Sequence, residues 1–396
     1  MSTHREHLLN FRRTTPIESH HFFGYYDKFP WDSTSRYLLA LEPGFIDRQP
    51  TADDTVRIGM VDTNEDRWIP IAETRAWNWQ QSSMLHWLPT AADREIIHND
   101  RDGNRFVSVI RDVFTGETCT LPLPIYCLRP DGKQAVTPNF ARIAVMRPGY
   151  GYEGVEDPSV AVSAPDNNGI RVMNLQTGES GLVITLAQAA SLDPKPSMEG
   201  ALHWFNHLQY NTTGTRFLFL HRWSQTTDDG PRNTRLLTAD PDGSDIRIIA
   251  DDGMTSHFDW RDENTILAWA RTEKDGDHYY LFDAMTGEYE LVGPDVLECD
   301  GHCSYSPDRE WILTDTYPGG GTRERTLILY HPGRDERIDI GRFYADPKYD
   351  GPTRTDLHPR WSRDGKSVCL DSVHERHGGD FTRQMYIADV SSIVRK

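Results

Sequence analysis

The chain repeats one short pattern seven times: a bulky residue, a polar turn and a short apolar run. The bulky residue is aromatic in six copies and leucine in one, and the copies begin at Trp31, Trp87, Leu128, Tyr210, Trp260, Tyr305 and Trp361. A polar turn of Pro, Asp, Gly or Asn between two strand-like segments is typical of a β-hairpin. A second apolar strand with a tight turn follows each hairpin, as in the Thr-Gly-Glu turns at 115–117, 177–179 and 286–288.

Two hairpins per unit predict a four-stranded antiparallel sheet. The seven units span 19–75, 76–123, 124–196, 197–252, 253–295, 296–346 and 347–396. Repetition of such a sheet predicts an all-β fold, a seven-bladed β-propeller forming a single domain over 1–396. The alternative is two stacked β-sandwiches. The strands of a sandwich would not repeat the same bulky residue, polar turn and apolar run seven times in order. Only one stretch, 186–192, is predicted to be helical.

The net charge and the cysteine content limit the classes of binding partner and the cellular compartment that we expect. The chain has 42 Lys and Arg against 60 Asp and Glu, a net charge of −18, which disfavours binding to nucleic acid or to an anionic membrane. The five cysteines are an odd number, and the N-terminal residues lack the apolar core of a signal peptide. We therefore expect a cytoplasmic protein with reduced thiols, as a monomer or small homo-oligomer.

A histidine recurs three residues before the landmark aromatic in the last four units. The four are His207, His257, His302 and His358, whereas the earlier units have Lys28, Met84 and Ile125 at this position. Because the first strand of each blade lines the central channel, these histidines are predicted to form an arc at one height around the axis. Neighbouring imidazoles favour metal binding or proton transfer. The alternative is that each one only caps its strand.

Further polar residues fall at the ends of the second strands, near the mouth of the channel. They are His98 to Arg101, His221, Arg222, Arg271, Asp315 with Tyr317, and Asp371 with His374. Arg222 and Arg271 are candidates to bind a substrate carboxylate with two parallel hydrogen bonds, although each could instead form a surface salt bridge.

Four segments resemble the oligogalacturonate lyase family of propeller polysaccharide lyases. They are HLQYNTTGTRFLFLHRW from His207, SHFDW from Ser256, GHCSYSPDREWILTDTYP from Gly301 and DLHPRWSRDGKSVCLDS from Asp356. The resemblance covers mainly residues 200–396. The His-Pro-Arg-Trp-Ser-Arg-Asp-Gly run at 358–365 is also common in TolB-like propellers without enzymatic activity, so it indicates the fold more than the function.

The resemblance implies a set of roles. His257 would be the catalytic base and Arg222 would neutralise the uronate carboxylate, while His302 and His358 would bind a divalent metal such as Mn, Ca or Zn. The family's extra ligands near the last histidine are missing, and Asp356 is the candidate replacement, with His257 as a further candidate ligand.

β-Elimination on a uronate requires a base, a cation on the carboxylate and an acid for the leaving oxygen. His207, Tyr152 and a metal-bound water are the candidate acids, and Arg271, His221 and His86 are candidate substrate contacts. A second possible catalytic set, from earlier blades, is His86, Tyr152 and Arg171. The predicted partner is a small acidic oligosaccharide, because a net charge of −18 would repel a long polyanion. The alternatives are a non-enzymatic propeller that binds sugar or protein, and a metal-dependent hydrolase.

Overall fold

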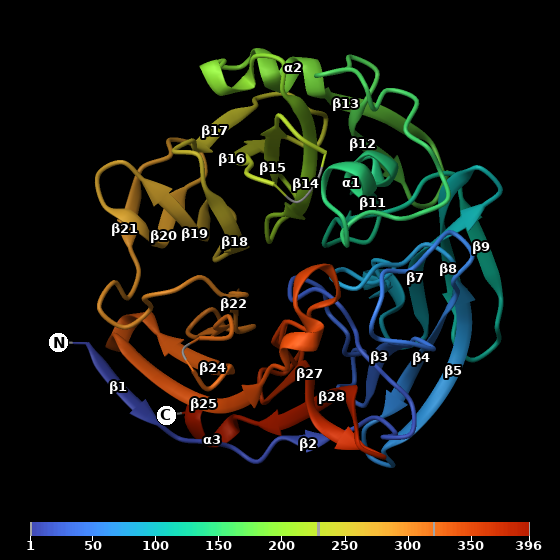
Figure 1. Cartoon of the computed structure of the whole chain (residues 1–396), viewed down its shortest axis with the longest axis vertical. Helices are drawn as coiled ribbons and strands as arrows, with labels where there is room; N and C mark the ends of the chain where they lie inside the picture. Colours follow the sequence, from blue (N-terminus) through green and yellow to red (C-terminus); the bar gives the residue numbers. More distant parts are fainter. Residues whose placement is uncertain (1, 228–229, 320, 396) are drawn as a thin grey trace.

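Seven β-sheets surround a common axis in the computed structural model, which describes residues 2–227, 230–319 and 321–395 (Figure 1). The predicted seven-bladed propeller is confirmed. In blades 2 to 5 the strand order follows the chain, and neighbouring strands are antiparallel. The sheets follow one another around the ring in sequence order, from the blue to the red end of the chain (Figure 1).

Blades 2 to 5 have four strands each. Blade 2 contains β6 (His86–Trp87), β7 (Glu95–Asp102), β8 (Arg105–Asp112) and β9 (Thr118–Leu121). Blade 3 contains β10 (Cys127–Leu128), β11 (Gln134–Thr137), β12 (Gly169–Asn174) and β13 (Ser180–Thr185). Blade 4 contains β14 (Leu202–Tyr210), β15 (Phe217–Ser224), β16 (Asn233–Ala239) and β17 (Arg247–Ala250). Blade 5 contains β18 (Thr255–Trp260), β19 (Thr265–Thr272), β20 (Gly276–Asp283) and β21 (Tyr289–Leu291).

The N-terminal residues complete the other three blades. Blade 1 contains β3 (Tyr37–Glu42), β4 (Val56–Asp62) and β5 (Arg67–Thr74), and two isolated bridges, Phe22–Leu41 and Trp31–Leu38, take the place of its innermost strand. Blade 6 contains β22 (Ser304–Tyr305), β23 (Ile312–Asp315), β24 (Glu324–His331) and β25 (Glu336–Tyr344), with β1 (Thr3–Glu6) added in parallel. Blade 7 contains β26 (Arg360–Trp361), β27 (Ser367–His377) and β28 (Asp380–Asp389), with β2 (Arg12–Arg13) as its outer strand. The first strands therefore lie beside the last (Figure 1).

Helices are few and short. The predicted helix at 186–192 is present as α2 (Leu186–Ser191), but the expectation of a single helical stretch was wrong. α1 (Phe140–Met146) begins after Asn139, whose side chain accepts hydrogen bonds from two amides of the first turn, and α3 (Ser391–Val394) ends the chain. The described part of the chain also has five short 3₁₀ turns: Pro89–Ala91, Pro196–Met198, Pro332–Arg334, Pro347–Tyr349 and Gly351–Thr353. No helix in the described ranges is long and apolar enough to cross a membrane.

The recurring aromatic residues connect neighbouring blades. The indole of Trp87 donates to the carbonyl of Pro30 at 2.8 Å, and that of Trp260 donates to the carbonyl of Gln209 at 3.1 Å. In both cases the acceptor belongs to the first segment of the preceding blade. At these two positions the indole buries its ring between blades and still satisfies its N–H, which suits tryptophan to this place in the fold.

Candidate active site

Three of the four recurring histidines lie in a row near the axis. The ring centroids of His257 and His302 are 4.2 Å apart, and those of His302 and His358 are 4.4 Å apart. His207 joins them through contacts with a tyrosine described below. Their exposed fractions are 5% for His207 and His257, 2% for His302 and 0% for His358. The arc predicted from the register is therefore present, and it is buried.

Local backbone irregularities direct these side chains. The ladder between β14 and β15 shifts register across His207, and the ladder between β18 and β19 shifts across His257. His207 and His358 also have positive φ angles of 53° and 41°. A bulge or left-handed residue turns a side chain out of the regular alternation of a strand, and such features cluster at functional sites.

Tyr25 lies in the middle of the four histidines, which the sequence did not indicate. Its ring centroid is 5.0 Å from His207, 5.1 Å from His358, 6.2 Å from His302 and 6.4 Å from His257. At these distances the rings are in contact, so no sugar ring fits between Tyr25 and the imidazoles.

The segment that carries Tyr25 is fixed on both sides of the axis. Asp371 of blade 7 accepts hydrogen bonds from the amides of Phe23 and Gly24. Gly24 has a φ of +119°, and a Cβ there would lie 2.9 Å from the Cβ of Ser82, so this position requires glycine. On the far side, the hydroxyl of Tyr26 both donates to and accepts from the backbone of Phe258, at 2.9 Å each.

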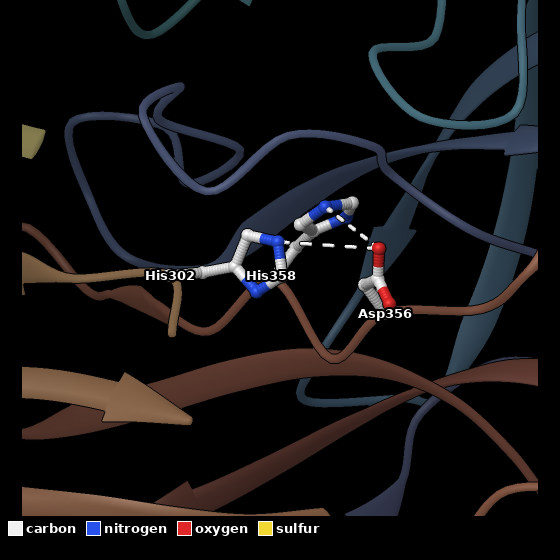
Figure 2. A group of neighbouring side chains, drawn as sticks. All are labelled: His302, Asp356 and His358. Atoms are coloured by element: carbon white, nitrogen blue, oxygen red, sulfur yellow. Dashed lines mark ion pairs between the residues drawn. The ribbon is translucent and has the colours of Figure 1, made fainter. Parts of the chain in front are cut away.

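His302, Asp356 and His358 form a group that could hold a metal ion. One ligand atom from each lies within 4.8 Å of the other two. Both imidazoles are turned toward the carboxylate of Asp356, whose Oδ2 is 4.0 Å from Nε2 of each histidine (Figure 2). Nε2 of His302 and both ring nitrogens of His358 are buried without a hydrogen-bond partner. Buried imidazole nitrogens without partners, beside a carboxylate, fit a divalent cation.

Charged neighbours set the protonation of this group. Burial lowers the pKa of His302, but the carboxylates of Asp315, Asp356 and Asp300 together more than offset this, and the net shift is upward. Asp315 accepts from Nδ1 of His302 at 2.8 Å, which leaves Nε2 for another partner. Burial would raise the pKa of Asp356, but Arg354 and Arg325 hold it well below its usual value, so Asp356 is ionised.

His257 has the geometry of a base. Its Nδ1 lies 2.9 Å from Oδ1 of Asp300, so Nδ1 carries the proton and Nε2 is the free acceptor. Burial, together with the charge of His302, lowers the pKa of His257 despite the opposing effect of Asp300. The imidazole is therefore neutral at pH 7, which is the form that accepts a proton.

Arg222 is a buried cation without a counter-ion among the residues that the structure describes. Its exposed fraction is 4%, and no hydrogen bond or ion pair is formed by its guanidinium within the described ranges, where Nε and Nη1 are buried without partners. Burial and the charge of Arg147 lower the pKa of Arg222 to about 9, so it remains protonated at neutral pH. Burial, together with the charge of Arg222, lowers the pKa of His207.

Tyr150 contacts the group of four histidines and Tyr25. Its ring centroid is 5.6 Å from His207, and its hydroxyl accepts a hydrogen bond from Nη2 of Arg354 at 2.7 Å. Burial alone would raise the pKa of Tyr150, but Arg354 and Arg147 lower it to about 8. A phenol of this kind exchanges its proton near neutral pH. The Gly149–Gly154 run contains the residue, but nothing in the sequence separates Tyr150 from Tyr152.

Comparison with known proteins concerns the fold. No known family model matches the chain, and no curated protein matches it. Among solved structures, an oligogalacturonate lyase in complex with manganese aligns with a TM-score of 0.67 and 16% identity over 100% of both chains. The oligogalacturonate lyase of Vibrio parahaemolyticus aligns with a TM-score of 0.65 and 14% identity over 97% of both chains.

The chain has the fold of these lyases. A Mycobacterium tuberculosis puromycin-hydrolysing peptidase is similar at a lower TM-score of 0.54 and 11% identity, covering 99% of this chain and 56% of that one. At such low sequence identities the likeness shows only the fold. The chemistry of the site is therefore inferred from the residues of this chain.

Other residues predicted for the site lie elsewhere in the propeller. Tyr152 packs against Phe140 and accepts a hydrogen bond from Asn99, and burial raises its pKa well above the usual value. His221 is enclosed in blade 4, where its nitrogens contact His203 and Arg235. Arg271 is exposed and pairs with Asp277.

Two further residues from the second predicted set are also separated from the four histidines. His86 lines a cavity at the hairpin-turn end of the channel, and Arg171 lines a different cavity. The structure thus brings together His207, His257, His302, His358 and Asp356, and it adds Tyr25 and Tyr150. Arg222 lies on β15, the neighbour of the strand that carries His207.

Proposed function

We propose that the protein is a metal-assisted lyase that cleaves a short uronic-acid oligosaccharide by β-elimination. The observation that carries this proposal is the buried guanidinium of Arg222, which has no hydrogen-bond or ion-pair partner among the described residues. A buried cation without a counter-ion is costly, and a carboxylate ligand would offset that cost. The likeness of the fold to the two oligogalacturonate lyases supports the same substrate class.

The proposed reaction uses three groups of this chain: His257 as the base, Arg222 as the cation and Tyr150 as the acid. Nε2 of His257 takes the proton from C5 of the uronate, and the electron pair of that C–H bond forms the C4=C5 double bond. The bond from C4 to the glycosidic oxygen breaks. Arg222 stabilises the negative charge that develops on the carboxylate.

The leaving oxygen needs a proton, and we assign Tyr150 as its donor. Its pKa of about 8 keeps it protonated at pH 7, and it can transfer its proton readily. His207 is less suitable, because burial and Arg222 lower its pKa and it is neutral at this pH. We therefore assign to Tyr150 the role for which the sequence suggested His207, Tyr152 or a metal-bound water.

His302, His358 and Asp356 would hold the divalent metal. The unpartnered nitrogens of both histidines and the ionised Asp356 suit such an ion, and the manganese bound to the similar lyase supports this assignment. When bound, the metal would supply positive charge for the substrate carboxylate. Mn, Ca and Zn remain the candidates.

The buried position of the histidines requires movement before substrate can bind. Tyr25 is in contact with all four imidazoles, so we propose that its ring leaves the centre of the group when the uronate carboxylate reaches Arg222. The non-enzymatic alternative keeps Tyr25 in place permanently, with the histidines serving as packing.

A direct assay separates these alternatives. Purified protein is incubated with a panel of uronic-acid oligosaccharides and with Mn, Ca or Zn, and the ultraviolet absorbance of the unsaturated uronate is followed. We expect absorbance to rise with at least one substrate and metal. Cleavage without new absorbance would indicate a hydrolase, and no cleavage of any member would indicate a binding propeller.

A further inference from the structure

A second ring of polar residues lies two positions after the recurring histidines. In blades 4 to 7 these residues are Gln209, Asp259, Ser304 and Arg360, and the same register gives His86 in blade 2 and Cys127 in blade 3. All six line one cavity of about 450 Å³, and residues 26–29 of the N-terminal segment line it too. Because every blade contributes, the cavity lies on the propeller axis. We call it the turn-side chamber.

The turn-side chamber is separate from the candidate active site. Its lining includes residues of the first hairpin turns, such as Pro89, Pro130 and Pro307, whereas Arg222 pairs with Trp204 near the opposite end of β14. Tyr26 lines the chamber, and its ring also contacts His257 and His302 at 5.6 and 5.5 Å. Tyr26 thus forms a partition between the two.

Several polar atoms of the chamber residues are buried without a hydrogen-bond partner. They are Oδ1 of Asp27, Nε2 of His86, Oε1 of Gln209, the hydroxyl of Tyr210 and Oγ of Ser304. The amide of Gln209 has a fixed orientation, because its Nε2 donates to Asp259 at 2.8 Å and leaves the oxygen free to accept. Such unsatisfied groups are costly, and hydroxyl groups of a ligand would satisfy both the acceptors and the two protein hydroxyls.

The chamber also holds one basic residue, Arg363, that forms no ion pair among the described residues. The other four basic residues of its lining are paired: Lys28 with Asp27, Arg129 with Asp131, Arg309 with Asp259 and Arg360 with Asp371. Arg363 donates to the carbonyl of Trp31 and lies over the ring of Phe29, which is 49% exposed. No carboxylate of the described residues forms an ion pair with Arg363. The charge of this unpaired guanidinium favours an anionic group on the ligand.

We propose that the turn-side chamber binds a small sugar acid, a molecule with several hydroxyls and one carboxylate. The hydroxyls meet the unpartnered acceptors, and the carboxylate meets Arg363 and the neighbouring cations. The proposal stands on the chamber's own residues and does not depend on catalysis by His257 and Arg222.

The test uses isothermal titration calorimetry with D-galacturonate, in a variant that isolates the chamber. Arg222→Gln removes the guanidinium at the other end of the channel, and because it deletes an uncompensated buried charge the variant should fold. We expect D-galacturonate to bind Arg222→Gln at one site. Adding Arg363→Gln should weaken binding by at least about tenfold, the effect of losing a charge-assisted contact.

Two matched probes test the ligand class. D-Galactose lacks the carboxylate and acetate lacks the hydroxyls, so each should bind at least about tenfold more weakly than D-galacturonate. Arg129→Gln replaces Arg363→Gln if the latter variant does not fold. No binding to Arg222→Gln, equal binding of all three probes, or binding unchanged by both arginine substitutions would overturn the proposal. Binding by the wild type that is lost in Arg222→Gln would place the ligand in the candidate active site instead.

Discussion

The ring of Tyr25 stacks on the imidazole of His207, with centroids 5.0 Å apart and planes inclined by 16°. Tyr25 precedes the first complete strand of blade 1, and His207 belongs to β14 of blade 4, so the contact joins distant parts of the ring. The N-terminal segment is therefore part of the candidate active site. Any substrate of this site competes with Tyr25 for the same space, which makes the following predictions depend on both the histidines and this segment.

Metal binding should stabilise the wild-type protein. We expect protein stripped with a chelator to gain thermal stability when Mn²⁺ is restored, by about 2.7 kcal/mol at a free concentration 100 times Kd. Asp356→Asn should abolish most of this gain, because it removes the negative ligand from the group. His374→Gln is a matched control on β27, outside the group. Elemental analysis and differential scanning calorimetry provide the measurements. A wild-type protein that retains no metal and shows no gain would leave His302 and His358 as structural residues.

Substitutions of the base and the carboxylate-binding cation should affect turnover more than folding. We expect His257→Ala and Arg222→Ala to lower kcat by about 10²–10⁴-fold, since each acts mainly in the transition state. Arg222→Lys should restore little activity, because an ammonium cannot reproduce the planar fork of a guanidinium. Steady-state kinetics alongside melting temperatures give the comparison. Parental turnover in His257→Ala would mean that another group takes the proton.

Tyr150 and Tyr152 offer a matched pair. Tyr150→Phe should lower kcat and remove the alkaline limb of the pH–rate profile. A general acid acts in its protonated form, so wild-type activity should fall as pH rises through the Tyr150 pKa of about 8. Tyr152→Phe loses a hydrogen bond with Asn99 and should cost only stability, about 1 kcal/mol. An alkaline limb that persists in Tyr150→Phe would exclude it as the acid.

The N-terminal strands should close the ring. β2 supplies the outer strand of blade 7, where Arg12 pairs with Ile387, and β1 covers the edge of blade 6. Deleting residues 1–13 exposes both edges, so we expect a lower melting temperature and increased association of the truncated chain. Calorimetry and light scattering measure these effects. Unchanged stability would show that the remaining blade-to-blade contacts suffice.

The repeats made much of this arrangement predictable. Each landmark aromatic occupies the same place between blades, so a fixed offset from it defined one height on the axis and identified His207, His257, His302 and His358 together. Tyr25 lay outside any repeat, because blade 1 replaces its innermost strand with isolated bridges. Arg271, like Arg222, lies near the end of the second strand of its blade, and this position predicted a place at the mouth of the channel. Arg271 instead pairs with Asp277 on the surface. Sequence position along the second strand does not determine which way an end residue turns.

Buried neutral histidines should make the protein sensitive to mild acid, and His98 provides the clearest test. It is 2% exposed, its Nδ1 contacts the carbonyl of Asn99 at 3.0 Å, and its Nε2 has no partner. Burial lowers its pKa from the usual 6.5. Below pH 6.5 the unfolded chain therefore binds a proton that the folded chain excludes, and stability falls as the pH decreases.

Urea unfolding at pH 7.5 and 5.5 measures this effect. We expect the wild type to lose stability at the lower pH, and His98→Gln to lose less, by up to about 1 kcal/mol, because one excluded proton has been removed. Comparing the two pH values within each protein cancels the cost of the substitution itself. His377→Gln, at an exposed position, should lose as much as the wild type. Equal losses in wild type and His98→Gln would mean that folded His98 accepts the proton, which would require its nitrogen to reach water or a new acceptor in blade 2.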